Sequence, residues 1–191
     1  MIDRDLKRSL GQMMKGVQVV GATDGNVSRL YCSHWVCQVS FDEPIVMASM
    51  SPKHDTYPIL RAAPAFSVSI LAADQVAQGQ YFSYPGRKFQ YLAEEYVTEW
   101  DGLPVVTGSI AWLRCEPFAV QESVGGRALD HHLVFAEITA ACEGRLGEPP
   151  LLYSARLGWR ATGDKAREPG VSIRDQLLAR LGEDAASDPD D

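Results

Sequence analysis

Residues 109–142 read SIAWLRCEPFAVQESVGGRALDHHLVFAEITAAC and hold the two longest predicted strands of the chain. Apolar and β-branched residues run through both halves and a Gly-Gly pair interrupts them, which is typical of two strands joined by a tight turn. We predict strands at Ser109–Glu122 and His131–Cys142, with the turn around Gly125 and Gly126. An antiparallel hairpin is therefore the centre of the predicted fold.

Shorter strands are predicted on both sides of this hairpin. Asp24-Gly25-Asn26 favours a hairpin turn between two β-rich segments. Short apolar runs elsewhere are typical of buried strands. The predicted strands are Val17–Ala22, Val27–Val36, Ile45–Met50, Ala65–Leu71 and Leu151–Tyr153.

The predicted helices are short. Leu6, Leu10, Met13 and Met14 have helical spacing, which indicates an amphipathic helix ending near Gly16. We expect a second helix after an N-cap at Asp55, and a third from Asp74 through Phe82, before a polar, turn-rich region that reaches Pro104. Many strands, few helices and no βαβ alternation predict a mainly β, antiparallel barrel with short flanking α-helices.

Composition places the chain among ordinary globular proteins and excludes several classes of function. Of its 191 residues 46% are hydrophobic, and the net charge is −7, which excludes disorder for most of the chain and argues against nucleic-acid or anionic-membrane binding. Five acidic residues and no base lie within residues 183–191, so the remaining body carries only −2. A local phosphate site stays possible, because it needs only a few donors.

We predict three segments along the chain: one domain over residues 1–162, a C-terminal extension with a helix over 163–182, and an acidic disordered tail over 183–191. Neither a signal sequence nor a run of 18 apolar residues is visible, and four scattered cysteines do not make a disulfide framework. We therefore expect a cytoplasmic protein with reduced thiols.

Few residues carry an obvious chemistry. Cys32, His34 and Cys37 are zinc-ligating types, but on a strand positions 32 and 34 share a face and 37 does not, so we predict no metal site. His131 and His132 are adjacent, so at most one can face a pocket, where Asp130 could orient its imidazole. Either histidine could equally be a structural hydrogen-bonding residue.

The loop SPKHDT at 51–56 gathers hydroxyls and a cation between a strand and a short helix. Such a loop can bind an anion through free backbone N–H groups and a nearby lysine. A solvated turn with a helix cap would explain the same residues. Both interpretations stay open on the residues alone.

Taken in order, these pieces resemble the flavin reductase-like family, from about Leu6 to Arg160. Val39–Pro44, VSFDEP, is similar to the family's V-S-L-D-P-P before a buried strand. Further similar segments follow in the family's order: Thr56–Ala63, Ser67–Gln75 (SVSILAADQ), Gly108–Glu116 (GSIAWLRCE), Asp130–Ile138, and Leu151–Tyr153 with Gly158–Arg160.

The resemblance implies a Greek-key split β-barrel that binds FMN, with FAD as an alternative, and uses NAD(P)H as co-substrate. It implies that Cys32, Ser33, His34 and Trp35 line the isoalloxazine, and that Ser49, Ser51, Lys53, Asp55 and Thr56 hold the flavin phosphate. It also implies that Arg87, Lys88 and Phe89 lie near the cofactor, and that His131 stands beside the flavin and nicotinamide as the catalytic residue.

Two departures from the family pattern leave more than one function open. His34 stands in place of the usual Asn, and Asp55 adds a negative charge next to the expected phosphate. We expect an NAD(P)H:flavin oxidoreductase that supplies reduced flavin to a monooxygenase or another acceptor, and that forms a homodimer. The alternatives are an FMN-binding electron carrier of the flavoredoxin type without NAD(P)H activity, and a structural member that has lost the cofactor.

Overall fold

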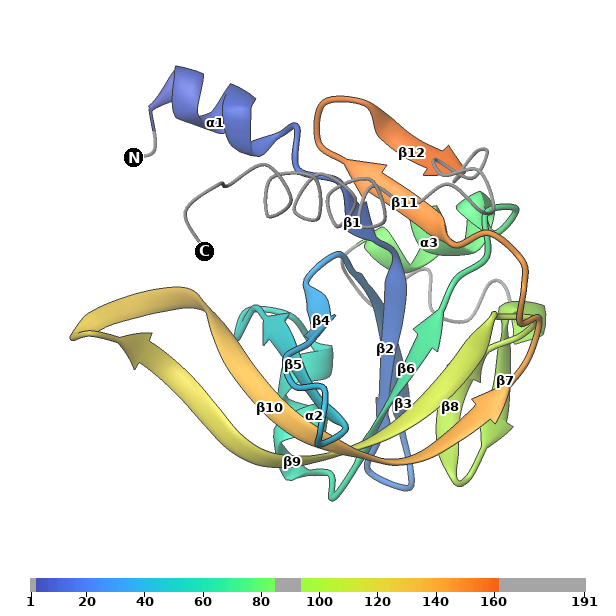
Figure 1. The fold of residues 1–191 in the computed structure, drawn as a ribbon. Coiled ribbons are helices and arrows are strands. Elements are labelled where there is room, and N and C mark those ends of the chain that lie inside the picture. The colour runs from blue at the N-terminus through green and yellow to red at the C-terminus, as the bar shows by residue number, and fades with distance from the viewer. Residues whose placement is uncertain (1–2, 85–93, 162–191) are drawn as a thin grey trace, which may run out of the picture.

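A computed structural model describes residues 3–84 and 94–161. Its main feature is a curled antiparallel sheet of seven strands (Figure 1). Across the sheet these are β3 (Ser28–Ser33), β2 (Gln18–Thr23), β6 (Phe66–Ile70), β9 (Ala111–Val124), β10 (Arg127–Glu143), β5 (Ile45–Met50) and β4 (Val36–Gln38). The curled sheet confirms the predicted mainly β, split-barrel fold class.

The central hairpin, β9 and β10, is confirmed and extends further than predicted. Arg127 pairs with Val124, so the strands continue to the turn itself, where Gly125 and Gly126 have φ of 57° and 75°. Both angles suit a tight hairpin turn and favour glycine. The hairpin projects beyond the rest of the sheet (Figure 1).

Two small sheets complete the strands. A three-stranded sheet has the order β1 (Lys15–Gly16), β11 (Leu151–Ser154) and β12 (Gly158–Ala161). The pair β7 (Val97–Trp100) and β8 (Leu103–Val106) follows a 3₁₀ turn at Glu94–Tyr96. The expectation of a turn-rich region to Pro104 was therefore wrong over β7 and β8. β7 has two exposed polar residues, Thr98 and Glu99, between two half-buried apolar ones, so it shows no alternating apolar pattern, whereas all four residues of β8 are buried.

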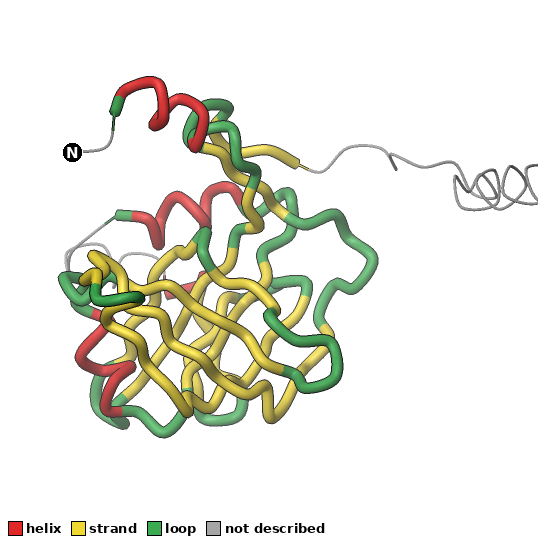
Figure 2. Tube along the Cα trace, turned by 60° about the vertical axis from the view of Figure 1, so that its left-hand side comes forward, coloured by secondary structure: helices red, strands yellow, loops and turns green. Residues whose placement is uncertain are grey.

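The three helices are α1 (Arg4–Leu10), α2 (Thr56–Ala62) and α3 (Val76–Ser83). α1 has an Asp3 cap and ends at Gly11, so the expectation that it reaches Gly16 was wrong: Lys15 and Gly16 pair as a strand instead. None of its residues is buried, and Figure 2 shows it standing apart from the body. The expected C-terminal helix over 163–182 and the tail over 183–191 lie outside the described residues.

The core has two parts. One fills the curl of the large sheet below α2, around Phe66, Met50 and Leu60. The other lies between the sheet, α3 and β11, around Leu71 and Val106. Together they fix the sheet against α2 on one side and against α3 and β11 on the other.

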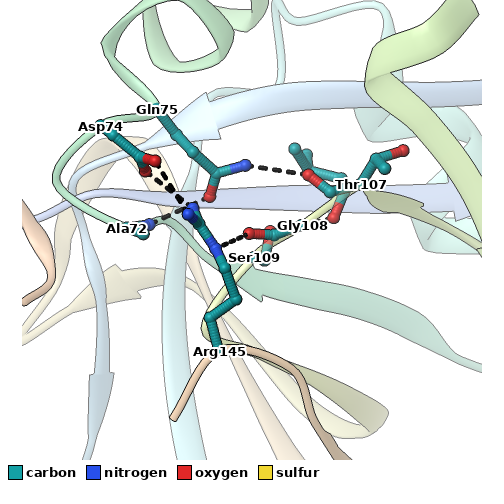
Figure 3. A network of polar contacts seen from close by, with 8 residues as sticks. Ala72, Asp74, Gln75, Thr107, Gly108, Ser109 and Arg145 are labelled. Carbon is teal, nitrogen blue, oxygen red and sulfur yellow. Dashed lines mark hydrogen bonds and ion pairs between the residues drawn. The ribbon is translucent and has the colours of Figure 1, made fainter. Parts of the chain in front are cut away.

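A polar network fixes the start of α3 (Figure 3). The buried Gln75 side chain accepts from the Ala72 N–H at 3.0 Å and donates to the Thr107 carbonyl at 2.9 Å. Asp74 does not cap the helix as predicted, because Gln75 occupies the N-cap position. Asp74 instead makes a bidentate pair with Arg145, at 2.7 and 2.8 Å, which holds the pKa of Asp74 below its ordinary value.

Replacing Gln75 by alanine is expected to lower the free energy of unfolding by about 1–3 kcal/mol, because the buried Ala72 N–H loses its acceptor. Chemical denaturation measures this. The matched control is Asp74→Asn, which weakens an exposed ion pair and should have a clearly smaller effect. Equal losses in the two variants would contradict this assignment.

Candidate flavin site

A cavity of about 340 Å³ lies where the three-stranded sheet meets the large one. β1 and β11 supply one wall, and β3, the β3–β4 connection, β5 with the loop after it, and β10 supply the others. Its lining residues are Lys15, Tyr31, Cys32, Ser33, His34, Trp35, Ser49, Ser51, His54, His131, Tyr153 and Ala155. Its volume is that of a small-molecule or cofactor site.

The connection between β3 and β4 exposes side chains to this cavity. A single strand Val27–Val36 was predicted, but the chain bends after Ser33, whose hydroxyl accepts from the Trp35 N–H at 3.2 Å. The Trp35 carbonyl then accepts from the Ser49 N–H at 2.9 Å, which ties the bend to β5. A serine hydroxyl that accepts a hydrogen bond from the backbone N–H two residues later commonly stabilises a turn.

His34 forms part of an aromatic wall. Its ring stacks on Tyr153, with centroids 4.3 Å apart and planes 12° apart, and meets the edge of Trp159 at 5.6 Å. Burial, helped by the Lys15 charge, lowers the pKa of His34 to about 4, so the imidazole is neutral at neutral pH. Its Nδ1 is buried and has no hydrogen-bond partner within the described residues. A ring nitrogen in that state is satisfied only by a ligand or water.

The low pKa of His34 makes the stability of the protein depend on pH. The unfolded chain takes up a proton near pH 6.5, and folded His34 only near pH 4, so its contribution is present above pH 6.5 and is lost as the pH falls toward 4. We expect His34→Gln to lose less stability over this interval than the wild type, as denaturation at several pH values would show. Parallel losses would contradict the low pKa.

His131 faces the cavity and His132 does not. The His131 Nδ1 lies 3.2 Å from the Asp130 carboxylate, and its ring meets the edge of the Trp35 ring with centroids 4.8 Å apart. His132 turns to the other side, where its Nδ1 lies 2.6 Å from the Tyr57 hydroxyl. The contact with His131 holds the pKa of Asp130 below its ordinary value, so this carboxylate stays ionised beside the imidazole.

The predicted phosphate loop is only partly in contact with the cavity. Ser49, Ser51 and His54 line it, whereas the exposed Lys53 does not, and neither Asp55 nor Thr56 lines it. The Thr56 hydroxyl is buried without a partner within the described residues.

Asp55 stands at the N-cap position of α2 but makes no capping bond, so the predicted side-chain cap was wrong. One of its oxygens lies 3.2 Å from the Nδ1 of His54, the atom that also accepts from the Thr56 N–H at 3.4 Å. The His54 imidazole therefore takes the place of the expected cap.

The remaining candidates are the 87–89 segment and the cysteines. Arg87, Lys88 and Phe89, predicted near the cofactor, lie outside the described residues. Cys37 is exposed, and burial raises the pKa of the Cys32 thiol to about 11. Across residues 3–84 and 94–161 no group of three or more His, Cys, Asp or Glu side chains could hold a metal ion.

Lys15, Tyr31, His54 and Tyr153 line the cavity but were not predicted as site residues. Lys15 and Tyr153 are opposite each other in the β1–β11 pair, which joins the two ends of the domain. No local pattern marks such a pairing. Tyr31 belongs to a strand whose inward face resembles core, and its hydroxyl is buried without a partner in the described part of the chain.

The cavity suits a flat aromatic ring with a polar edge. Tyr153, His34 and Trp35 supply aromatic rings to the wall, and the buried His34 Nδ1 and Tyr31 hydroxyl have no hydrogen-bond partner among residues 3–84 and 94–161. Apolar walls with a few unsatisfied polar atoms are typical of cofactor sites. The fold and the cavity together define a split barrel with a cofactor-sized aromatic pocket, and an isoalloxazine fits its donor set.

Comparison with known proteins agrees with this class. Residues 10–157 match the family model described as the flavin reductase like domain. The chain therefore belongs to the flavin reductase-like family.

The relatives carry matching names. The chain is 31% identical to an FMN reductase (NADH) from Agrobacterium fabrum over 76% of this chain and 79% of that one. It is 33% identical to the reductase component of a 4-hydroxyphenylacetate 3-monooxygenase from Thermus thermophilus, over 81% of this chain and 93% of that one. A solved NADH:FAD oxidoreductase of Streptomyces globisporus superposes with a TM-score of 0.74 at 23% identity, covering 87% of this chain and 99% of that one.

A search for helices that could cross a bilayer found none in the described part of the chain.

Proposed function

We propose that this protein is an NADH-dependent flavin reductase that reduces FMN, accepts FAD, and supplies reduced flavin to a monooxygenase. The observation that carries the proposal is the cavity with an aromatic wall, whose lining residues His34 and Tyr31 each hold a buried polar atom without a hydrogen-bond partner among the described residues. Relatives named for NADH-dependent reduction of FMN or FAD, and for reductase components of monooxygenases, support it.

When bound, the flavin supplies the hydride acceptor, since its ring takes the two electrons and the hydrogen that NADH gives up. The chain's own residues bind and orient it. We assign ring contacts to Cys32, Ser33, His34 and Trp35, phosphate contacts to Ser49, Ser51 and Lys53, and a neighbouring position to Arg87, Lys88 and Phe89, whereas the buried Thr56 is not assigned a contact. Asp55 shapes this loop through His54 and holds no phosphate directly.

His131 is the residue that we assign to catalysis. Asp130 fixes its imidazole, and Trp35 supports one side of the ring, so the imidazole is held at the cavity instead of rotating freely. A histidine held in this way can orient the nicotinamide or exchange a proton with a bound group.

The same proposal includes a homodimer. Leu6, Leu10, Met13 and Met14 are each at least 43% exposed, on a helix with no buried residue and the segment after it. Apolar side chains gathered in this way favour a covering partner. We infer that a second copy of the chain covers these side chains. We also infer that the protein works in the cytoplasm, which keeps cysteine thiols reduced. Sedimentation showing only monomer at micromolar concentration would contradict the dimer.

Steady-state assays test the function. The full chain should oxidise NADH when FMN is added, at a rate that depends on both substrates, with NADPH less effective. A protein that purifies yellow but oxidises neither nucleotide would instead be an electron carrier of the flavoredoxin type. A colourless protein that shows no thermal shift with FMN, FAD or riboflavin would contradict both.

Replacing Lys53 by alanine is expected to weaken FMN binding by about threefold, as loss of one exposed charge contact would. Riboflavin, which lacks the phosphate, should bind the variant as it binds the wild type. Fluorescence titration with the two flavins measures this. The matched control is Arg61→Ala, which removes an exposed cation at the far end of α2. If Lys53→Ala weakened the binding of FMN and of riboflavin equally, the phosphate assignment would be wrong.

A further inference from the structure

Lys15 places a positive charge in the wall of the cavity. It lies on β1 opposite Tyr153, is half-buried, and its Nζ stands 5.5 Å above the centre of the Trp35 ring. Within residues 3–84 and 94–161 no carboxylate forms an ion pair with it. Its charge therefore acts on whatever the cavity holds.

The surroundings of Lys15 do little to cancel this charge. Its neighbours in the wall are the rings of Trp35 and Tyr153 and the neutral imidazole of His34. The Trp35 ring attracts the ammonium group through its π-face but carries no net charge. A cation among apolar and neutral groups is screened less than one in water, so its field extends into the cavity.

The position of Lys15 separates it from the proposed phosphate contacts. Lys15 belongs to the three-stranded sheet, whereas Ser49 and Ser51 come from the end of β5 in the seven-stranded sheet. Figure 1 shows β1 and β11 above β5 and α2, and the cavity lies between residues of β1 and β11 and residues at the end of β5. A ligand with its phosphate at the Ser51 loop would turn its ring toward Lys15.

We propose that Lys15 stabilises the negative charge of the reduced flavin ring, and so favours the reduced over the oxidised flavin in this site. The inference rests on the proposed function. NADH gives a hydride to the neutral oxidised ring and leaves as NAD⁺; the ring gains two electrons and one proton, and carries one negative charge until a second proton arrives from solvent. A fixed cation acts on that product and hardly on the neutral starting ring.

The test compares Lys15→Met, which keeps the length of the side chain without its charge, with Lys15→Arg, which keeps the charge. Anaerobic titration of the full chain gives the Kd for oxidised and for reduced FMN. We expect Lys15→Met to bind oxidised FMN within about twofold of the wild type and reduced FMN about fivefold more weakly. At 29.6 mV per tenfold for a two-electron couple, the potential of the bound flavin falls by about 20 mV. Lys15→Arg should restore both values.

Riboflavin separates the ring from the phosphate. If Lys15 acts on the ring charge, Lys15→Met changes the ratio of the two Kd values equally for FMN and riboflavin. If it binds the phosphate instead, both oxidation states of FMN weaken and riboflavin does not, which overturns the proposal. An unchanged ratio, or a change only in the KM for NADH, also overturns it.

Two controls keep the result interpretable. Lys7→Met removes an exposed lysine of α1 that does not line the cavity, and should leave the Kd ratio unchanged. Thermal unfolding of Lys15→Met and Lys15→Arg shows whether each is folded at the assay temperature. A wild type that binds no flavin would defeat the proposed function together with this inference, whereas a flavin-binding wild type with an unaltered ratio in Lys15→Met defeats the inference alone.

Discussion

Replacing His131 by alanine is expected to lower kcat for NADH-dependent FMN reduction by roughly 10- to 100-fold, toward the lower range of what a positioned acid–base group contributes. His131 is held at the cavity by Asp130 and by the edge of Trp35, so its loss removes the assigned acid–base group and one support of the Trp35 ring. Stopped-flow measurement of flavin reduction under anaerobic conditions gives this rate without interference from reoxidation.

The neighbouring histidine is the matched control. His132 lies on the same strand but faces Tyr57 and Glu122, away from the cavity. His132→Ala should therefore leave kcat within about twofold of the wild type, even if it costs some stability by removing the partner of the Tyr57 hydroxyl. If His131→Ala reduces flavin as fast as the wild type, the catalytic assignment is wrong.

Replacing Gly21 by alanine is expected to destabilise the fold by about 3 kcal/mol, or roughly 6–12 °C in Tm. A Cβ on Gly21 would lie 2.6 Å from the Ser67 hydroxyl oxygen and still closer to the Pro104 carbonyl oxygen. The carbonyl belongs to the backbone of β8, which is fully buried beside β2, so the strands must move apart to admit a methyl group. Differential scanning calorimetry measures the change.

A second glycine separates crowding from backbone strain. Gly25 has a φ of 91° in the β2–β3 turn, and a Cβ there meets nothing within 4 Å. Gly25→Asn should cost clearly less than Gly21→Ala, because asparagine tolerates positive φ better than other side chains and has room at this position. Comparable losses in the two variants would mean that close packing is not what requires Gly21.

The strands that the sequence predicted well are those with a strong local pattern. Ile45–Met50 is observed with these bounds, and the glycine pair in the turn predicted the long β9–β10 hairpin. β7 was missed because its four residues show no alternating apolar pattern, and the break between β3 and β4 was missed because the Ser33 bend depends on pairing with β5. Local propensity cannot show a turn that a distant strand stabilises.

The site was predicted in part. Ser49, His34 and His131 come from separate segments, and the resemblance to the family was needed to place them together. Lys15 and Tyr153 were not predicted, because they meet only when β1 pairs with β11. A two-residue strand such as β1 has no periodicity, so only the folded structure shows that Lys15 belongs to the site.

We expect the cavity between His34 and His131 to hold the flavin that NADH reduces. A crystal structure of the protein with FMN, followed by an anaerobic soak in NADH, tests it most directly. We expect the flavin ring against His34 and Tyr153, its phosphate at Ser51 and Lys53, and loss of the yellow colour on addition of NADH. Flavin bound outside this cavity, or flavin in the cavity that stays yellow with NADH, would contradict it.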